Sequence, residues 1–384
     1  MWIWQYPEWP NFVVDASGFS ERVETFHRMA ERLAGQVDAL SDANQTDASV
    51  DLMLSEVLAS YAIEGETLDR DSVRSSLLAH FGRVVSGGGH DNNKAAAAAD
   101  LIVDVRQNWH RPLSHEVLGR WQSLVVVDQI TSLMMRGAYR NYPEPMRIIS
   151  GGSAGRPGRI HYEAPPSADV PAEMERFLDW YNDGDTDLPG PIRAAVAHVW
   201  FEKIHPFDDG NGRVGRAISD HALSQALGRP TLACLATAIN EDRNGYYDAL
   251  ETVGRGQFDL SGFADYFTRA VNRAQEIAVA EVAFVLGKAR FYDRYGQRLN
   301  ERQREVTARI FREGRNGFSG GLSRKNYVSI TRCSPATASR DLVDLLNMGA
   351  LVSHGQGRST RYEISCPEPS AVARTAGGYG LSEN

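Results

Sequence analysis

The stretch His205-Pro-Phe-Asp-Asp-Gly-Asn-Gly-Arg-Val-Gly-Arg216 lies between two runs of apolar residues with helical spacing. The run before it starts at Pro191, a residue suited to a first helical position, and is ended by Pro206, which cannot continue a helix. The run after it starts near Gly212 and stops at Gly228. We therefore expect two buried helices joined by a short bend, at the centre of a mainly helical fold.

The residue types in the bend suit a bound anion. Gly210 and Gly212 allow the backbone to approach an anion closely and to adopt positive φ. The amides that follow open a helix, where unpaired N–H groups and the helix dipole attract phosphate. Arg213 and Arg216 are three residues apart, so both guanidinium groups can reach the same side of the bend.

Two further side chains in the bend can do chemistry. Asp209 can hold a divalent cation that bridges two phosphates, which suits Mg²⁺. His205 can take a proton from an attacking hydroxyl group. Phe207 is expected to turn inward and pin the bend to the core. Taken singly, a histidine or an Asn-Gly pair is more typical of packing or of a turn, and only the combination favours a site.

At every specified position the stretch resembles the signature of the Fic family, His-x-Phe-x-(Asp/Glu)-Gly-Asn-Gly-Arg-x-x-Arg. The resemblance implies a helical core that transfers AMP from ATP, with Mg²⁺ or Mn²⁺, to a Ser, Thr or Tyr hydroxyl of a target protein. It implies that His205 is the general base and that Asp209 holds the metal. The residues implied for phosphate binding are Gly210, Asn211, Gly212, Arg213 and Arg216.

Two short β-like runs, Met146–Ser150 and Arg159–Tyr162, surround a Gly-rich centre and predict a hairpin. By the resemblance, residues 146–162 are the flap that docks the target segment by strand addition. Its expected docking residues are Met146, Arg147, Ile148, Ile160 and Tyr162. Residues at places where the family often has adenine contacts are Asn244, Tyr246 and Tyr247, although helix packing explains the two tyrosines equally well.

The stretch Ser60-Tyr-Ala-Ile-Glu64-Gly65 ends an apolar-periodic helix whose buried face is expected to carry Leu54, Leu58, Tyr61 and Ala62. Gly65 is a candidate C-terminal cap. Spacing alone favours a solvated acid at Glu64. The stretch resembles the Fic inhibitory motif, (Ser/Thr)-x-x-x-Glu-(Gly/Asn), which implies that Glu64 pairs with Arg216 and keeps the γ-phosphate from its productive pose. The same glutamate could instead position a water that removes AMP.

The chain changes character near its C-terminus. Twelve basic residues against six acidic ones give residues 297–364 a formal charge of +6, whereas the whole chain carries −8. Helical patterns around Val306 and Leu342, followed by β-like runs at 351–353 and 361–364, resemble a winged helix-turn-helix over residues 297–365. Candidate DNA contacts are Lys325, Thr337, Ser339, Arg340, Arg358 and Arg361. Winged helices also bind proteins, so both kinds of partner remain open.

The length of 384 residues predicts two or three domains. We expect an N-terminal helical module at 1–110 with the inhibitory motif at 60–65, a catalytic core at 111–280, the winged helix-turn-helix at 297–365 and a flexible tail at 366–384. The aromatic start, Trp2, Trp4 and Trp9, is expected to seal an extended segment onto the helical body. The rival to an enzyme is a DNA-binding regulator whose core senses nucleotide.

Composition sets the remaining expectations. A hydrophobic fraction of 42% is ordinary for a globular protein, and no apolar run of about 18 residues predicts a membrane span. The first residues lack the features of a secretory signal. Cys234, Cys333 and Cys366 are far apart, so we expect neither a disulfide framework nor a zinc site. A cytoplasmic protein without membrane partners follows, and a homodimer is compatible with an inhibition that assembly relieves.

Overall fold

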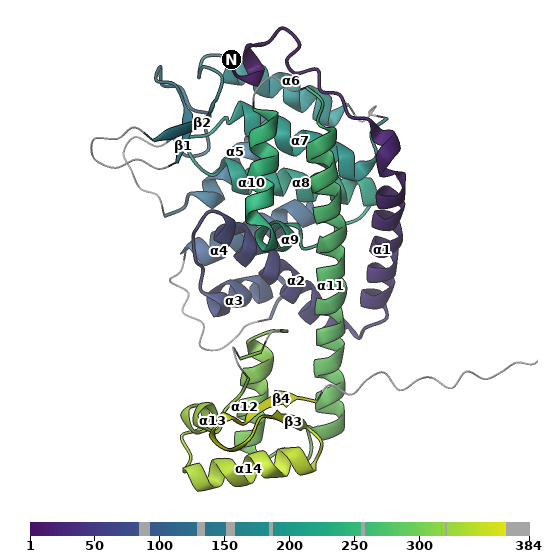
Figure 1. Ribbon diagram of the computed structural model, residues 1–384, viewed down its shortest axis with the longest axis vertical. Coiled ribbons are helices and arrows are strands. Elements are labelled where there is room, and N and C mark those ends of the chain that lie inside the picture. The colour runs from purple at the N-terminus through teal and green to yellow at the C-terminus, as the bar shows by residue number, and fades with distance from the viewer. Residues whose placement is uncertain are drawn as a thin grey trace, which may run out of the picture. The chain divides into compact units, whose positions relative to one another are not determined.

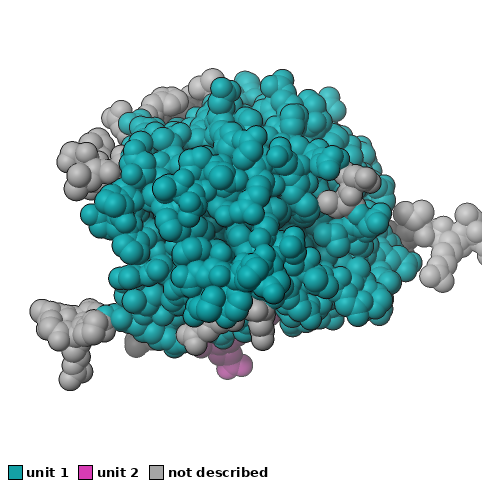
Figure 2. All heavy atoms as spheres, turned by 90° about the horizontal axis from the view of Figure 1, so that it is seen from above, with its two compact units in different colours: residues 1–280 teal, residues 281–384 magenta. Residues whose placement is uncertain are grey.

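The computed structural model describes residues 1–83, 93–128, 135–150, 158–183, 187–254, 258–315, 317–318 and 321–365. The fold is mainly helical with two small hairpins (Figure 1). It divides into two compact units, Met1–Ala280 and Glu281–Asn384 (Figure 2). The boundary expected near residue 110 therefore falls inside the first unit. The expected tail at 366–384 and the centre of the expected flap, 151–157, lie outside the described residues.

The first unit is built from helices and one hairpin. Its helices before the flap are α1 (Ser20–Asp38), α2 (Asp42–Ile63), α3 (Arg70–His80), α4 (Asn93–Gln107) and α5 (His115–Val125). After the hairpin of β1 (Arg147–Ser150) and β2 (Arg159–Glu163) come α6 (Val170–Asn182), α7 (Gly190–Ile204), α8 (Asn211–Leu227), α9 (Leu235–Glu241) and α10 (Arg243–Val253). Helix α11 (Ser261–Tyr295) contributes residues to both units.

Helices α7 and α8 form the buried centre of the first unit, as predicted. They pack side by side (Figure 1), and α7 is buried at almost every position from Pro191 to Ile204. Helix α7 ends at Ile204 because Pro206 follows shortly after it. Helix α8 ends at Gly228, which takes a left-handed cap conformation with φ 65°. The predicted helix pair is confirmed at both ends of the bend.

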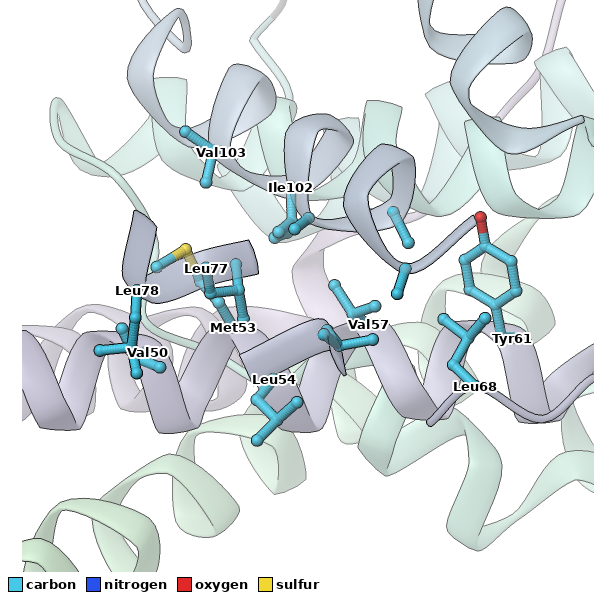
Figure 3. Close-up of a cluster of buried hydrophobic side chains, with 14 residues drawn as sticks. Val50, Met53, Leu54, Val57, Tyr61, Leu68, Leu77, Leu78, Ile102 and Val103 are labelled. Carbon is cyan, nitrogen blue, oxygen red and sulfur yellow. The ribbon is translucent and has the colours of Figure 1, made fainter. Parts of the chain in front are cut away.

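Helix α2 is held by an apolar cluster shared with α3 and α4 (Figure 3). Leu54 and Tyr61 of α2 are buried, as predicted, whereas Leu58 and Ala62 are only partly buried. Burying a leucine or valine side chain contributes about 1.5–3 kcal/mol. Because the cluster includes Tyr61, near the C-terminus of α2, it fixes the position of residues 60–65.

The N-terminal aromatic residues pack against the body, as expected. The indole Nε1 of Trp4 donates to the carbonyl of Glu163, and that of Trp9 donates to the carboxylate of Glu173, each over 2.8 Å. Trp2 packs edge-to-face on Tyr162, with ring centroids 5.5 Å apart. These contacts tie Trp2 and Trp4 to β2 and Trp9 to α6.

Beyond the end of α11, the described residues of the second unit include the helices α12 (Glu301–Arg312), α13 (Arg324–Thr331) and α14 (Pro335–Asn347) and the hairpin of β3 (Leu351–His354) and β4 (Arg361–Ile364). Ser334 caps α14 by accepting from the Thr337 amide, with Pro335 in the first turn, as predicted. The carboxylate of buried Asp341 accepts hydrogen bonds from Arg302 and Tyr327. Within the described part of the chain, no helix is long and apolar enough to cross a membrane.

Candidate active site

The bend between α7 and α8 owes its shape to two residues with positive φ. His205 has φ 51° and closes α7 in a left-handed conformation that is unfavourable for a residue with a Cβ. Gly210 has φ 89° and opens α8, and a Cβ there would lie 2.8 Å from Cγ1 of Val125. The bend therefore needs a glycine at its second turning point and support at its first.

Internal hydrogen bonds close the bend into a compact loop. The side chain of Asn211 accepts from the Phe207 amide over 3.0 Å and donates to the Phe207 carbonyl over 2.8 Å. Phe207 is fully buried and contacts the ring of Tyr139, which confirms its inward orientation. Buried Gln122 donates to the Asp209 carbonyl over 3.2 Å. Asn211, which we expected at the phosphates, thus also holds the backbone of the loop.

The imidazole of His205 is largely buried, with 13% of its side chain exposed. Its Nδ1 is buried, has no hydrogen-bond partner among the described residues and lies 3.9 Å from Oε2 of Glu202. Burial, followed by the nearby cation of Arg140, lowers the pKa of His205 to about 4. Burial also raises the pKa of Glu202 to about 7, and the neighbouring Glu64 carboxylate adds to this rise. The imidazole is therefore neutral near pH 7 and can accept a proton.

The N-terminus of α8 meets residues 60–65, the stretch that resembles an inhibitory motif. A Cβ at Gly212 would collide with the Glu64 carboxylate and would lie 3.2 Å from Nη1 of Arg216. The glycine therefore leaves room for an anionic group beside the first turn of α8, which contains no acidic residue of its own. An anion at this place gains from the unpaired amides and from the helix dipole. Glu64 supplies that anion.

Arg216 is enclosed by residues of the stretch 60–65. The residue is 3% exposed, and its guanidinium donates to Oε1 of Glu64 over 2.8 Å, to the Ser60 hydroxyl over 3.0 Å and to the Ser60 carbonyl over 2.8 Å. Gly65 follows Glu64 with φ 77°, which suits a glycine. The structure thus brings together the acid and the arginine that the resemblance pairs.

Arg213 has an acidic partner that the sequence reasoning did not single out. Its Nη1 donates to Oε1 of Glu66 over 2.7 Å, and Glu66 also forms an ion pair with Lys94. The Arg213 guanidinium lies over the ring of Tyr61, 5.1 Å from its centroid. Glu66 stands two residues after Glu64, but nothing in its spacing distinguishes it from an ordinary surface acid.

Asp209, the expected metal ligand, lies at the mouth of the bend. Its side chain is 39% exposed, Oδ1 accepts from the Gly210 amide over 2.6 Å, and Oδ2 lies 3.4 Å from Nη2 of Arg213. No cluster of three or more potential metal ligands occurs among the described residues. One carboxylate beside a helix N-terminus nevertheless fits Mg²⁺, which is usually held by one or two carboxylates plus substrate phosphates.

The expected flap forms an antiparallel hairpin in which Ile148 faces Tyr162 and Ser150 faces Arg159. Ile148 and Ile160 are 40% and 37% exposed, and Arg147 is exposed. Met146 directly precedes β1 and is partly buried. Tyr162 departs from expectation, because it is buried and its hydroxyl donates to the Lys203 carbonyl over 2.6 Å. Tyr162 therefore anchors the hairpin to α7 and offers no docking surface.

The three residues expected near the adenine all lie in α10 but differ in burial. Tyr246 is buried, with its hydroxyl 2.8 Å from Nε2 of His198, so the packing alternative describes it. Tyr247 is 40% exposed and donates to the Ile63 carbonyl at the end of α2 over 3.2 Å. Asn244 is exposed on the first turn of α10. An adenine contact remains a prediction for Asn244 and Tyr247.

Two parts of the chain match described families. Residues 112–223, which include the whole bend, match the Fic/DOC family. Residues 2–83, which include the inhibitory motif, match a domain of unknown function, DUF4172. The side chains that meet at the α8 N-terminus therefore come from two different matched regions.

Curated relatives and one solved structure agree with the Fic/DOC match. The chain is 26% identical over 255 residues to a protein adenylyltransferase Fic of Culex quinquefasciatus, covering 64% of this chain and 47% of that protein. It is 30% identical over 128 residues to one of Nematostella vectensis, covering 33% and 28%. The chain spans about half the length, or less, of these curated relatives. A Fic family protein of Desulfovibrio desulfuricans G20 shares the fold, with TM-score 0.51, 20% identity and coverage of 91% and 98%.

Proposed function

We propose that the chain, whose Fic/DOC segment contains this bend, is a protein adenylyltransferase. It would transfer AMP from ATP to a hydroxyl side chain of a target protein. The observation that carries the proposal is the junction of a neutral, largely buried His205 with the N-terminus of α8, which suits an anion. In this reaction the acceptor oxygen bonds to the α-phosphorus while the bond from that phosphorus to the pyrophosphate oxygen breaks. His205 takes the acceptor proton through Nε2, since Nδ1 is buried beside Glu202.

The remaining residues of the bend orient the triphosphate. The amides at Asn211 and Gly212 and the guanidinium of Arg213 would bind phosphate oxygens. Asp209 would hold Mg²⁺ or Mn²⁺, which neutralises phosphate charge when it is bound. The exposed edge of the hairpin, with Ile148 and Ile160, would dock the target segment.

The resting protein is inhibited by Glu64 in this proposal. Its carboxylate holds Arg216 and stands beside Gly212, where a phosphate would have to sit. Glu64→Gly removes the carboxylate and should raise AMP transfer strongly. The test is mass spectrometry of the full-length Glu64→Gly protein after incubation with ATP and Mg²⁺, with the mass gain of one AMP as the expected result. The matched control, Glu64→Gly with His205→Ala, should bind ATP and gain no mass.

If Glu64→Gly gains no mass with any offered target, the enzymatic proposal fails and the rival reading, a nucleotide-sensing regulator, is favoured. Removal of AMP is a separate outcome of the same reagents. Incubating an AMP-labelled Glu64→Gly protein with wild-type protein tests it, because only a Glu64 that positions water would release AMP from the labelled chain.

The second unit supports a second candidate function, DNA binding by a winged helix-turn-helix. Several of its cations are committed to acids, since Arg302 pairs with Asp341 and Arg309 pairs with Glu313. Lys325, Arg332 and Arg340 are exposed. Ser339 is a weaker candidate than expected, because its hydroxyl donates to the Pro335 carbonyl within α14.

Duplex binding tests this candidate. Each phosphate contact should lower the logarithm of the binding constant by about 0.9 per tenfold rise in salt concentration. Arg340→Ala and Lys325→Ala should each reduce that slope by about one contact. An absence of measurable duplex binding at low salt would remove DNA as a partner and favour a protein.

A further inference from the structure

Arg140 lies deep in the first unit. Among the described residues, its guanidinium donates hydrogen bonds to carbonyl and hydroxyl oxygens. The residue is 1% exposed. Its Nε donates to the His205 carbonyl over 2.9 Å, and its Nη2 donates to the carbonyls of Ile204 over 3.2 Å and Pro165 over 2.6 Å. Its Nη1 donates to the Ser167 hydroxyl over 3.0 Å. One side chain therefore joins the segment before α6 to the start of the bend.

The backbone of Arg140 extends this contact by one residue. Its amide donates to the Pro206 carbonyl over 2.9 Å. Arg140 thus serves three consecutive carbonyls, those of Ile204, His205 and Pro206. A helix C-terminus leaves such carbonyls without helical partners and carries partial negative charge, so a buried cation is stabilised there.

His205 needs this support because its backbone is left-handed. Among the described residues, the other non-glycine residue with positive φ is Arg332, in the second unit. A residue with a Cβ keeps this conformation only where its surroundings over-determine it. The hydrogen bonds from Arg140 to the carbonyls on either side of His205, and to that of His205 itself, provide such a constraint.

We propose that Arg140 is the positioning residue that locks the peptide groups around His205 and so aims its imidazole at the α8 N-terminus. The proposal rests on the proposed role of His205 as general base. Arg140 itself touches no reacting atom. An arginine is required because its planar fork serves several acceptors at fixed angles, whereas a lysine ammonium offers three donors from a single atom.

The charge of Arg140 also affects the imidazole, because it favours the neutral form of His205. After burial, the Arg140 cation is the largest influence that lowers the pKa of His205. Lys203 and the Glu202 carbonyl on α7, and Glu64 at the end of α2, also act on His205, and the Glu202 carboxylate lies 3.9 Å from its Nδ1. Loss of the Arg140 charge should therefore raise the pKa of His205 and move the acid limb of the pH–rate profile to higher pH.

The test compares Arg140→Met and Arg140→Lys in the full-length Glu64→Gly protein. Arg140→Met removes both the fork and the charge, and Arg140→Lys keeps the charge alone. The matched control is Arg136→Met, because Arg136 lies on the same segment, is exposed and donates to the Ser123 carbonyl over 3.2 Å. The readouts are kcat and KM for ATP across pH, and NMR titration of ¹⁵N-labelled His205.

Arg140→Met should lower kcat on the order of 100-fold, since a misplaced base loses its near-attack geometry. KM for ATP should stay within about twofold. The His205 titration midpoint should rise in Arg140→Met and stay low in Arg140→Lys, whose kcat should nevertheless fall. Arg136→Met should change none of these quantities.

The inference is overturned if either Arg140 variant keeps the parent kcat, or if both lose only thermal stability while the His205 signal and its titration stay as in the parent. A failure of the proposed function has a different signature. In that case the Glu64→Gly parent itself transfers no AMP, while the change in the His205 resonance on replacing Arg140 is still measured and still decides the positioning role.

Discussion

Glu66 holds Arg213 through a 2.7 Å hydrogen bond between residues 147 positions apart in the chain. Glu64 holds Arg216 in the same manner, and Gly65 lies between the two acids. Both signature arginines are therefore occupied by one three-residue segment at the end of α2. A triphosphate that binds both arginines must displace both carboxylates, so release of Glu64 alone frees only half of the site.

Replacing Glu66 by glutamine should destabilise the apo protein and strengthen its response to phosphates. The Arg213 side chain is 3% exposed, and a buried cation that loses its acid is costly. Because Glu66 is itself 23% exposed, we expect a loss of about 1–2 kcal/mol in the free energy of unfolding. Thermal shift measurements should show a lower Tm for Glu66→Gln and a larger rise in Tm on adding ATP or pyrophosphate than in wild type.

The control for this prediction is Glu241→Gln, which removes an equal charge from an exposed ion pair with Arg273. That change should cost at most about 1 kcal/mol and leave the response to ATP unaltered. An equal rise in Tm for Glu66→Gln and wild type would show that Glu66 does not compete with phosphate for Arg213.

Gly212→Ala should disturb the contact between Glu64 and Arg216 without raising the rate of AMP transfer. A Cβ at this position collides with the Glu64 carboxylate, so it disturbs the pair with Arg216. The same Cβ obstructs the approach of a phosphate to the first turn of α8. We expect Gly212→Ala to show no activation, and Glu64→Gly with Gly212→Ala to transfer AMP at least about tenfold more slowly than Glu64→Gly alone. Equal rates in a labelled-ATP assay would exclude close phosphate contact at Gly212.

The parts of the fold that could be predicted from the sequence are those determined by residues close together in the chain. Pro206 and Gly228 end α7 and α8 through backbone chemistry that acts within a few residues. The hairpin at 147–163 and the cap at Ser334 are local in the same sense. The meeting of Glu64 with Arg216 is different, because only the resemblance of two motifs to one family linked residues so far apart.

The residues that sequence reasoning missed act over long distances or carry no periodic signal. Glu66 and Arg140 are single charged residues in irregular segments, and their partners lie far along the chain. Tyr162 departs from its expected docking role, and Tyr246 follows the packing alternative that the sequence left open, since a tyrosine ring suits both a binding surface and a core. Their burial depends on hydrogen-bond partners at Lys203 and His198, which only the folded structure brings near.

Glu202→Gln should change how stability depends on pH. Burial, with a further contribution from Glu64, raises the pKa of Glu202 from 4.5 to about 7. Between these values the folded chain binds a proton that the unfolded chain releases, so this group's contribution to the free energy of unfolding falls as pH rises. Glutamine removes that fall. In urea unfolding, the variant should gain on the order of 1–3 kcal/mol over wild type between pH 4.5 and pH 8. A constant difference across this range would contradict the raised pKa.

Asp209→Asn should impair catalysis without affecting stability. The Asp209 side chain is 39% exposed, and an asparagine oxygen can still accept the Gly210 amide. The free energy of unfolding should therefore change by less than about 0.5 kcal/mol. A neutral amide is a poor ligand for Mg²⁺, so in the Glu64→Gly protein the rate of AMP transfer should fall on the order of 100-fold, with saturation at a higher Mg²⁺ concentration.

The neighbouring Asp208 offers a matched control for this last change. Asp208 accepts the Met135 amide over 2.9 Å, and asparagine preserves an acceptor there. Asp208→Asn removes the same charge one residue away, so it should leave the Mg²⁺ dependence of AMP transfer as it is. An equal loss of rate in both variants would mean that the total negative charge of the bend matters. Asp209 would then not be the specific ligand of the metal.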